Sequence, residues 1–122
     1  MHTNNVAVAE EYYTLIGEKN AEGIKKHLHP NVELYSPLAI VKGKEAVFKA
    51  ASNFINMIKS LTIRAKFGAG DQAMIVCDSA IPGMVESFPT ASLLSFRDEL
   101  IVKIELFYDG GRLVEKKEEV FS

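Results

Sequence analysis

The sequence has few of the residues that stabilise secreted or membrane-bound chains. Cys77 is its one cysteine, so an intramolecular disulfide is excluded. No apolar stretch approaches the roughly 18 residues that a membrane-spanning helix needs, so no membrane association is expected. The chain does not open with basic residues followed by an apolar run, which is the pattern of a secretory signal. We therefore expect a cytoplasmic protein.

An excess of basic charge is also missing. The sequence has 14 Lys and Arg against 16 Asp and Glu, for a net charge of -2, and its basic residues are scattered. A nucleic-acid-binding protein needs a basic face that neutralises phosphates, so nucleic acid is not an expected partner. The sequence contains no glycine-rich phosphate loop, no Ser-His-Asp order and no CxxC motif. No cofactor is expected either.

What is present is an ordinary globular composition over 122 residues, with 48% hydrophobic residues. A chain of this length is expected to form one domain, here residues 1–122, with one hydrophobic core.

The first half has the periodicity of helices. Apolar residues at spacings of three and four predict a helix that ends near Gly17, a short helix from Asn20 to His27, and a long helix over 44–59. Ile24 and Leu28 are expected to face inward from the second helix. The long helix has a predicted buried stripe of Val47, Ala51, Phe54 and Ile58.

The second half alternates with a period of two, which predicts strands. The expected strands are 32–36, 61–67, 72–80, 90–96 and 100–108, and the last of these is the longest and most apolar. Residues 113–122 suit either a helix or an edge strand. Helices followed by consecutive hairpins predict an α+β fold with an antiparallel meander.

Several short motifs resemble the NTF2-like superfamily, in particular its SnoaL-like and ketosteroid isomerase-like branch. They are Glu10-Glu11-Tyr12-Tyr13, Leu28-His29-Pro30-Asn31-Val32, Ser36-Pro37, Gly43-Lys44-Glu45-Ala46 and Ile104-Glu105-Leu106-Phe107-Tyr108-Asp109. The resemblance covers nearly the whole chain. It implies a cystatin-like cone, in which three N-terminal helices pack against a curved antiparallel sheet around an apolar pocket. It also implies a homodimer.

The isomerase branch combines a carboxylate base with a tyrosine and a protonated aspartic acid. The resemblance places the tyrosine at Tyr12, with Tyr13 as the alternative, and places the two acids at Ser36 and Ser92. General-base catalysis contributes roughly 10²–10⁴-fold, and a serine hydroxyl does not replace a carboxylate base near neutral pH. Ketosteroid isomerase chemistry is therefore not expected.

Other candidate site residues come from strand alternation. Ser92 shares a face with Leu94 and Phe96, and Tyr108 shares a face with Val102, Ile104 and Leu106. Two alternations compete around Asp78; matching the Pro82-Gly83 turn to the family hairpin favours Cys77 and Ser79 inward and Asp78 in solvent. The candidate ligand-binding residues are Tyr12, Ser36, Phe54, Cys77, Ser79, Ser92 and Tyr108.

Two further pairs of residues are explained without a catalytic or metal-binding role. His27 and His29 are two residues apart, which does not put them on one helix face, so no metal site is expected. Arg64 and Lys66 alternate with apolar residues and are expected on the solvated side of their strand.

Three functions remain open. The favoured hypothesis is the binding of a small apolar molecule in the cone pocket. The alternative is an isomerase, cyclase or dehydratase that uses Tyr12 or Tyr108 as a proton donor and Asp78 as a base. The third is a dimeric interaction module, in which Ile101 and Phe107 lie on the outer face of the sheet and contact a second copy.

Overall fold

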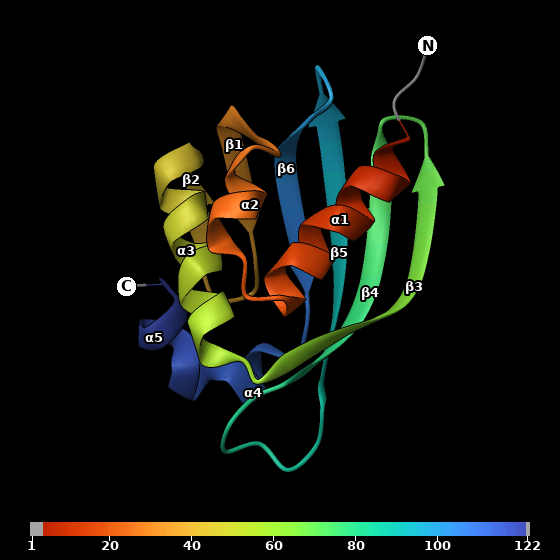
Figure 1. The fold of residues 1–122 in the computed structure, drawn as a ribbon. Coiled ribbons are helices and arrows are strands. Elements are labelled where there is room, and N and C mark those ends of the chain that lie inside the picture. The colour runs from red at the N-terminus through yellow and green to blue at the C-terminus, as the bar shows by residue number, and fades with distance from the viewer. Residues whose placement is uncertain (1–3, 122) are drawn as a thin grey trace.

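The computed structural model describes residues 4–121 and is shown in Figure 1. In chain order its elements are α1 (Asn5–Gly17), α2 (Ala21–Lys25), β1 (Leu28–Tyr35), β2 (Ile40–Lys42), α3 (Lys44–Met57), β3 (Ser60–Ala69), β4 (Gln72–Ala80), β5 (Phe88–Arg97), β6 (Leu100–Phe107), α4 (Gly110–Leu113), the 3-10 turn η1 (Val114–Lys116) and α5 (Lys117–Phe121). The α+β class predicted from the sequence is confirmed.

One sheet of six strands forms the scaffold, in the order β2-β1-β6-β5-β4-β3. All neighbouring pairs are antiparallel except β1 and β6, which run parallel. Helix α1 packs on β3 and β4, whereas α3 packs on β1 and against α5. Both helices therefore cover the same face of the curved sheet (Figure 1). The other face is called here the outer face, and within residues 4–121 no helix lies on it.

Several predicted boundaries hold, and others need correction. β4 spans 72–80 as predicted, whereas the second helix is shorter than predicted and Leu28 is buried from β1. β2 was not predicted, because its three residues follow Pro37 closely and show little alternation. β6 has 8 residues and is shorter than β3 and β5, with 10 each. The tail, ambiguous in the sequence, is helical over its described residues 113–121, and Ser122 lies outside the described part of the chain.

Irregular pairing changes which side chains face inward on two strands. Between β5 and β6, Ser95 pairs with Lys103 but Phe96 pairs with Ile101, so one residue of β6 bulges. Ile101 is consequently 0% exposed, and its predicted place on the outer face is wrong. Phe107 is 53% exposed. A second irregularity, between Ile63 and Ala65, lets Lys66 reach Glu10 of α1 at 2.8 Å.

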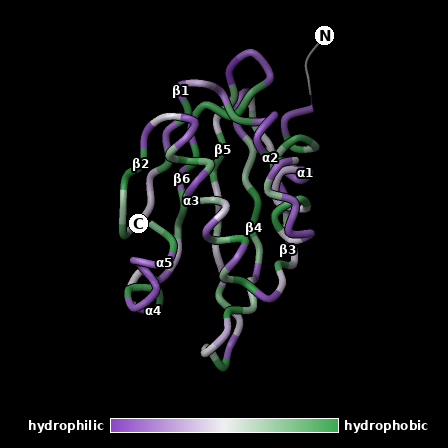
Figure 2. The backbone as a smooth tube through the Cα atoms, turned by 60° about the vertical axis from the view of Figure 1, so that its left-hand side comes forward, coloured by the Kyte–Doolittle hydropathy of each residue, from purple (hydrophilic) through white to green (hydrophobic). Residues whose placement is uncertain are grey.

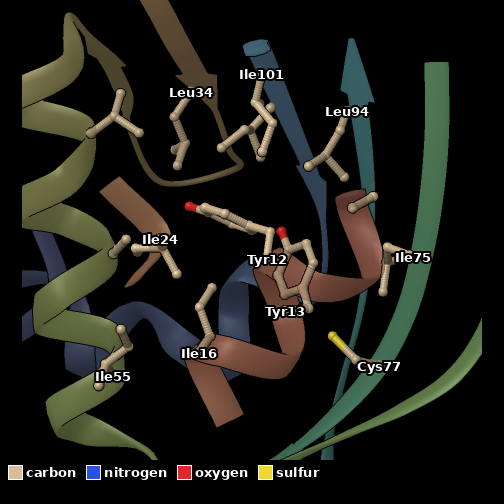
Figure 3. Close-up of a cluster of buried hydrophobic side chains, with 14 of the residues drawn as sticks. Tyr12, Tyr13, Ile16, Ile24, Leu34, Ile55, Ile75, Cys77, Leu94 and Ile101 are labelled. Carbon is tan, nitrogen blue, oxygen red and sulfur yellow. The ribbon is translucent and has the colours of Figure 1, made fainter. Parts of the chain in front are cut away.

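Inward-facing residues of the strands and helices form one continuous hydrophobic core, part of which is drawn in Figure 3. Within α3 the buried stripe differs by one residue from the prediction. Val47, Ala51 and Ile58 are buried, but Ile55 is the fully packed neighbour and Phe54 is only partly buried. Figure 2 shows long hydrophobic stretches on the strands and a hydrophilic turn at residues 97–99. Asp98 and Glu99 both have positive φ there, as a two-residue hairpin turn requires.

Side-chain hydrogen bonds cap the N-termini of α1 and α2. Asn4 accepts a hydrogen bond from the Ala7 N–H at 3.1 Å, and Asn20 accepts one from the Gly23 N–H at 2.8 Å. At the C-terminal end of α3, the Lys19 ammonium donates to the carbonyls of Ile55 and Ile58. A cation at this helix terminus is favourable because carbonyls without partners gather there. These contacts fix α1 and α3 relative to each other above the sheet.

Candidate ligand cavity

A cavity of about 70 Å³ lies between the sheet, α1, α3 and the helical tail. At roughly 10–15 Å³ for each water molecule, this space holds about five waters or a slender organic molecule of similar bulk. Its walls come from nearly every element of the fold. The lining residues are Tyr12, Tyr13, Ile16, Leu34, Ala50, Ala51, Phe54, Leu61, Cys77, Ser79, Phe88, Thr90, Ser92, Ile104, Leu106, Tyr108, Leu113, Val120 and Phe121.

At the α1 end of the cavity, two polar side chains satisfy each other. The Tyr13 hydroxyl donates to the Ser92 hydroxyl oxygen over 2.7 Å, and both side chains are buried. Tyr12 packs edge-on against Tyr13, with ring centroids 5.2 Å apart. Figure 3 shows both tyrosines projecting from α1 into the space between helices and sheet. The geometry therefore pairs Tyr13, rather than Tyr12, with the position at which the resemblance expects an acid.

At the tail end, one buried hydroxyl has no partner among the described residues. The Ser79 hydroxyl is buried, with 1% of the residue exposed, and makes no hydrogen bond. The Tyr108 ring packs on Phe88 at 5.5 Å between centroids, and its hydroxyl interacts with the Ser36 side chain and the Leu38 backbone, which partly offsets the effect of burial on its pKa. Buried hydroxyls in native structures are usually hydrogen-bonded, so Ser79 marks the end of the cavity that the protein leaves unsatisfied.

The ionisable groups of the cavity are all held in their neutral forms. Burial raises the pKa of Tyr12, Tyr13 and Tyr108, and it raises the pKa of Cys77 to about 11. Among the lining residues there is no Asp, Glu, His, Lys or Arg. Near neutral pH the cavity therefore offers hydroxyls, a thiol and hydrocarbon, and it provides neither a charged base nor a charged acid.

Two predicted site residues lie outside the cavity lining. The Ser36 hydroxyl closes a turn, where it donates to the Ala39 carbonyl at 3.1 Å and accepts from the Ala39 N–H at 3.2 Å. Asp78 projects from the outer face, where its carboxylate binds the Arg64 guanidinium at 3.2 and 3.3 Å. The structure brings the other six together, because all of them line one cavity: Tyr12, Phe54, Cys77, Ser79, Ser92 and Tyr108.

Sequence reasoning missed other parts of the lining. Thr90 and Phe88 lie two and four residues before Ser92 on β5, so alternation from Ser92 identifies them once the strand is known to begin at Phe88. The contributions of Leu113, Val120 and Phe121 depend on how the tail folds back. That path is set by the hydrogen bond from the Asn53 amide to the Val120 carbonyl, at 3.1 Å, and nothing in the local pattern indicates it.

Outside the cavity, the described residues include one ion pair with a histidine but no group suited to bind a metal ion. The His27 Nε2 atom lies 2.9 Å from a Glu11 carboxylate oxygen, and burial lowers the pKa of His27. Within residues 4–121, no three His, Cys, Asp or Glu side chains are grouped as a metal ion would need. Over the same residues, no helix combines the length and apolar character required to cross a bilayer.

The sequence profile of the SnoaL-like domain matches residues 9–104, which is most of the chain and extends from within α1 to the middle of β6. The chain belongs to the SnoaL-like domain family. The predicted assignment to the NTF2-like superfamily and its SnoaL-like branch is thereby confirmed. No curated protein matches the chain at a significant level.

Several solved structures share the fold of this SnoaL-like domain. An NTF2-like protein of unknown function from Cytophaga hutchinsonii has a TM-score of 0.78 at 16% identity, over 93% of this chain and 97% of that one. A steroid delta-isomerase from Pseudomonas aeruginosa has a TM-score of 0.81 at 18% identity, over 98% and 90%. A de novo designed protein with a curved β-sheet reaches 0.85 at 19%, over 98% and 97%. At these identities the likeness establishes the cone fold alone.

Proposed function

We propose that this SnoaL-like domain binds a small, neutral, mainly apolar molecule in the cavity without transforming it chemically. One observation carries the proposal: the cavity is lined by hydrocarbon, hydroxyls and a protonated thiol, with no charged side chain. A charged ligand would be transferred from water into a lining that offers no countercharge, which is costly. A neutral ligand loses little solvation and gains apolar contact.

The absence of a base in the lining separates this proposal from the enzymatic alternative. Tyr13 and Ser92 resemble part of an oxyanion site, but Ser36 is occupied in its turn and Asp78 projects from the opposite face. Proton abstraction from carbon needs a base within hydrogen-bond reach of the substrate. We expect no proton transfer on a 3-oxo-Δ5-steroid. Isomerase activity that Tyr13→Phe abolishes would instead support the enzyme hypothesis.

Calorimetric titration of the intact chain tests the proposal. The ligands are straight-chain alcohols and methyl ketones, with the carboxylates and amines of equal length as charged counterparts. We expect saturable binding of neutral compounds and at least about tenfold weaker binding of charged ones, because no lining group compensates a charge. Binding of neutral compounds should not change between about pH 6 and pH 8, since no lining group titrates there. Equal affinity for the charged compounds would contradict the proposal.

A matched pair of variants on α3 tests whether the ligand binds in the cavity. Ala50 is buried and lines the cavity, whereas Ala46 lies on the same helix and is exposed. Ala50→Leu fills part of the space and should abolish binding, while Ala46→Leu should leave it unchanged. Binding that survives Ala50→Leu in a correctly folded variant would locate the ligand elsewhere.

We also propose that the chain forms a homodimer through the outer face. The register places Phe67, Met74 and Leu93 in one outward row and Val76 and Phe107 in the next. Phe67 and Phe107 are 62% and 53% exposed, and an apolar patch of this kind is unusual on a monomer. A standard interface would bury roughly 800 Å² on each chain. Sedimentation equilibrium should give a dimer that Phe107→Asp dissociates; a monomer mass up to high micromolar concentration would refute it.

A further inference from the structure

We propose that the ligand of the cavity is elongated and carries a neutral hydrogen-bonding group at each end. The hydroxyl pair of Tyr13 and Ser92 holds one end, and the Ser79 hydroxyl holds the other. This inference rests on the proposed binding function and specifies the class of ligand.

The sheet itself gives the distance between the two ends. Ser92 of β5 pairs with Ile75 of β4, and Ser79 lies four residues farther along β4. Four residues of a strand span about 13 Å. Both serines face the same cavity, and the concave curve of the sheet brings their side chains closer than their Cα atoms. The cavity is therefore a slot with a polar group near each end.

The Ser79 hydroxyl makes no hydrogen bond to any of the described residues. Its cross-strand neighbours are Leu61 on β3 and Phe88 on β5, which are both apolar. Only 1% of Ser79 is exposed, so bulk water does not solvate it. Since a buried hydroxyl is seldom left without a hydrogen bond, a polar atom of a bound molecule is the natural partner.

The opposite end also has unused hydrogen-bonding capacity. Tyr13 and Ser92 have two hydroxyl protons between them, and one of these is used in their mutual hydrogen bond. The second proton is available to an outside acceptor. Between the two ends the floor is formed by Cys77 and Thr90, which are paired across the strands, and the roof by aliphatic and aromatic side chains. The matching ligand has a hydroxyl, carbonyl or ether oxygen at each end and hydrocarbon between them.

Terminal diols of four, six and eight carbons, compared with the mono-alcohols of the same lengths, test this ligand class by calorimetry. A mono-alcohol can satisfy one end only, so Ser79→Ala should weaken binding of the six- or eight-carbon diol by about three- to tenfold and of its mono-alcohol by less than twofold. The four-carbon diol is too short to reach both ends and should behave like a mono-alcohol.

The control variant is Ser60→Ala, which removes an exposed serine hydroxyl on β3 outside the cavity lining. It should change no affinity, and thermal melts should show that both variants fold. Mono-alcohols that bind saturably while Ser79→Ala affects diol and mono-alcohol equally would overturn the two-ended ligand and leave the binding function standing. Saturable binding of no neutral compound at all would overturn the binding function and this inference with it.

Discussion

The two ends of the cavity differ in how the protein treats its own buried hydroxyls. At the α1 end, Tyr13 and Ser92 come from distant parts of the chain and meet at 2.7 Å. At the tail end, the Ser79 hydroxyl is equally withdrawn from water and has no partner among residues 4–121. A satisfied pair stabilises the fold, whereas an unsatisfied hydroxyl costs stability unless something else binds it. The hydroxyl pair at the α1 end therefore stabilises the fold even without a ligand, whereas the Ser79 hydroxyl at the tail end depends on a bound molecule for its hydrogen bond.

Two adjacent residues of α3 give the largest expected difference. Ile55 is packed in the core, whereas Phe54 is partly buried and lines the cavity. Ile55→Ala should lower the free energy of unfolding by about 2–5 kcal/mol, and Phe54→Ala by about 1–3 kcal/mol because its site is already part empty. Denaturant titration measures both. Equal losses would mean that Phe54 belongs to the core after all.

Alkaline pH should destabilise the protein because it deprotonates the thiol of Cys77, which lies in the floor of the cavity. Burial raises the pKa of Cys77 from its usual 9.0 to about 11, so the unfolded chain loses this proton first. The stabilisation is complete below pH 9 and is lost as the pH rises toward 11, by about 3 kcal/mol in total. Burial also raises the pKa of Tyr12 and Tyr13, which extends the loss above pH 10.

Denaturant titrations at several pH values follow this loss, with Cys77→Ala as the control. The variant should lose less stability than the wild type between about pH 9 and pH 10, where the thiol is the main buried group that titrates. Identical pH profiles would show that the thiol does not cause the alkaline loss.

Breaking the hydrogen bond between Tyr13 and Ser92 should lower the free energy of unfolding by a smaller amount. Tyr13→Phe keeps the ring but leaves the Ser92 hydroxyl buried without its donor, so unfolding should become easier by about 1–2 kcal/mol. The matched control is Tyr35→Phe, since the Tyr35 hydroxyl donates to Glu33 at 2.6 Å in a partly exposed position. A loss for Tyr13→Phe no greater than that for Tyr35→Phe would remove the distinction between the ends.

The smallest expected change in stability is that of Ser79→Ala, and it is a gain rather than a loss. Ser79→Ala removes a buried hydroxyl that has no partner, so in the absence of ligand the melting temperature should stay constant or rise, with a gain of up to about 1 kcal/mol. Differential scanning calorimetry of the ligand-free chain measures it. A clear destabilisation would show that the Ser79 hydroxyl is satisfied within the fold.

Local pattern was sufficient for the strand meander and for half of the site. Alternation left two faces open for β4, and matching the Pro82-Gly83 turn to the family hairpin placed Cys77 and Ser79 inward and Asp78 outward. The structure agrees, because a regular strand keeps its parity. The same reasoning was wrong for Ile101, since a bulge in β6 changes parity without any signal such as glycine or proline nearby.

Long-range geometry was beyond what local pattern could predict. Tyr12 and Tyr13 are adjacent and equally buried, and only the placement of α1 across β3 and β4 decides which of them meets Ser92. Gly68 allows this close approach of α1 to β3, since a Cβ atom there would lie 2.3 Å from a Val6 methyl group and the Val6 side chain would have to shift. The roof of the cavity likewise depends on the Asn53 contact to the tail.

The parallel pairing of β1 with β6 has a consequence for how the chain is made. Strand β1 ends at Tyr35, and its sheet partner begins at Leu100, so β1 leaves the ribosome long before β6 exists. The pairing between them closes a loop of most of the chain, and contacts of such large sequence separation form slowly. The nascent N-terminal half therefore exposes an apolar strand next to an unfinished core, and this interval is when the protein is most open to a chaperone or to aggregation.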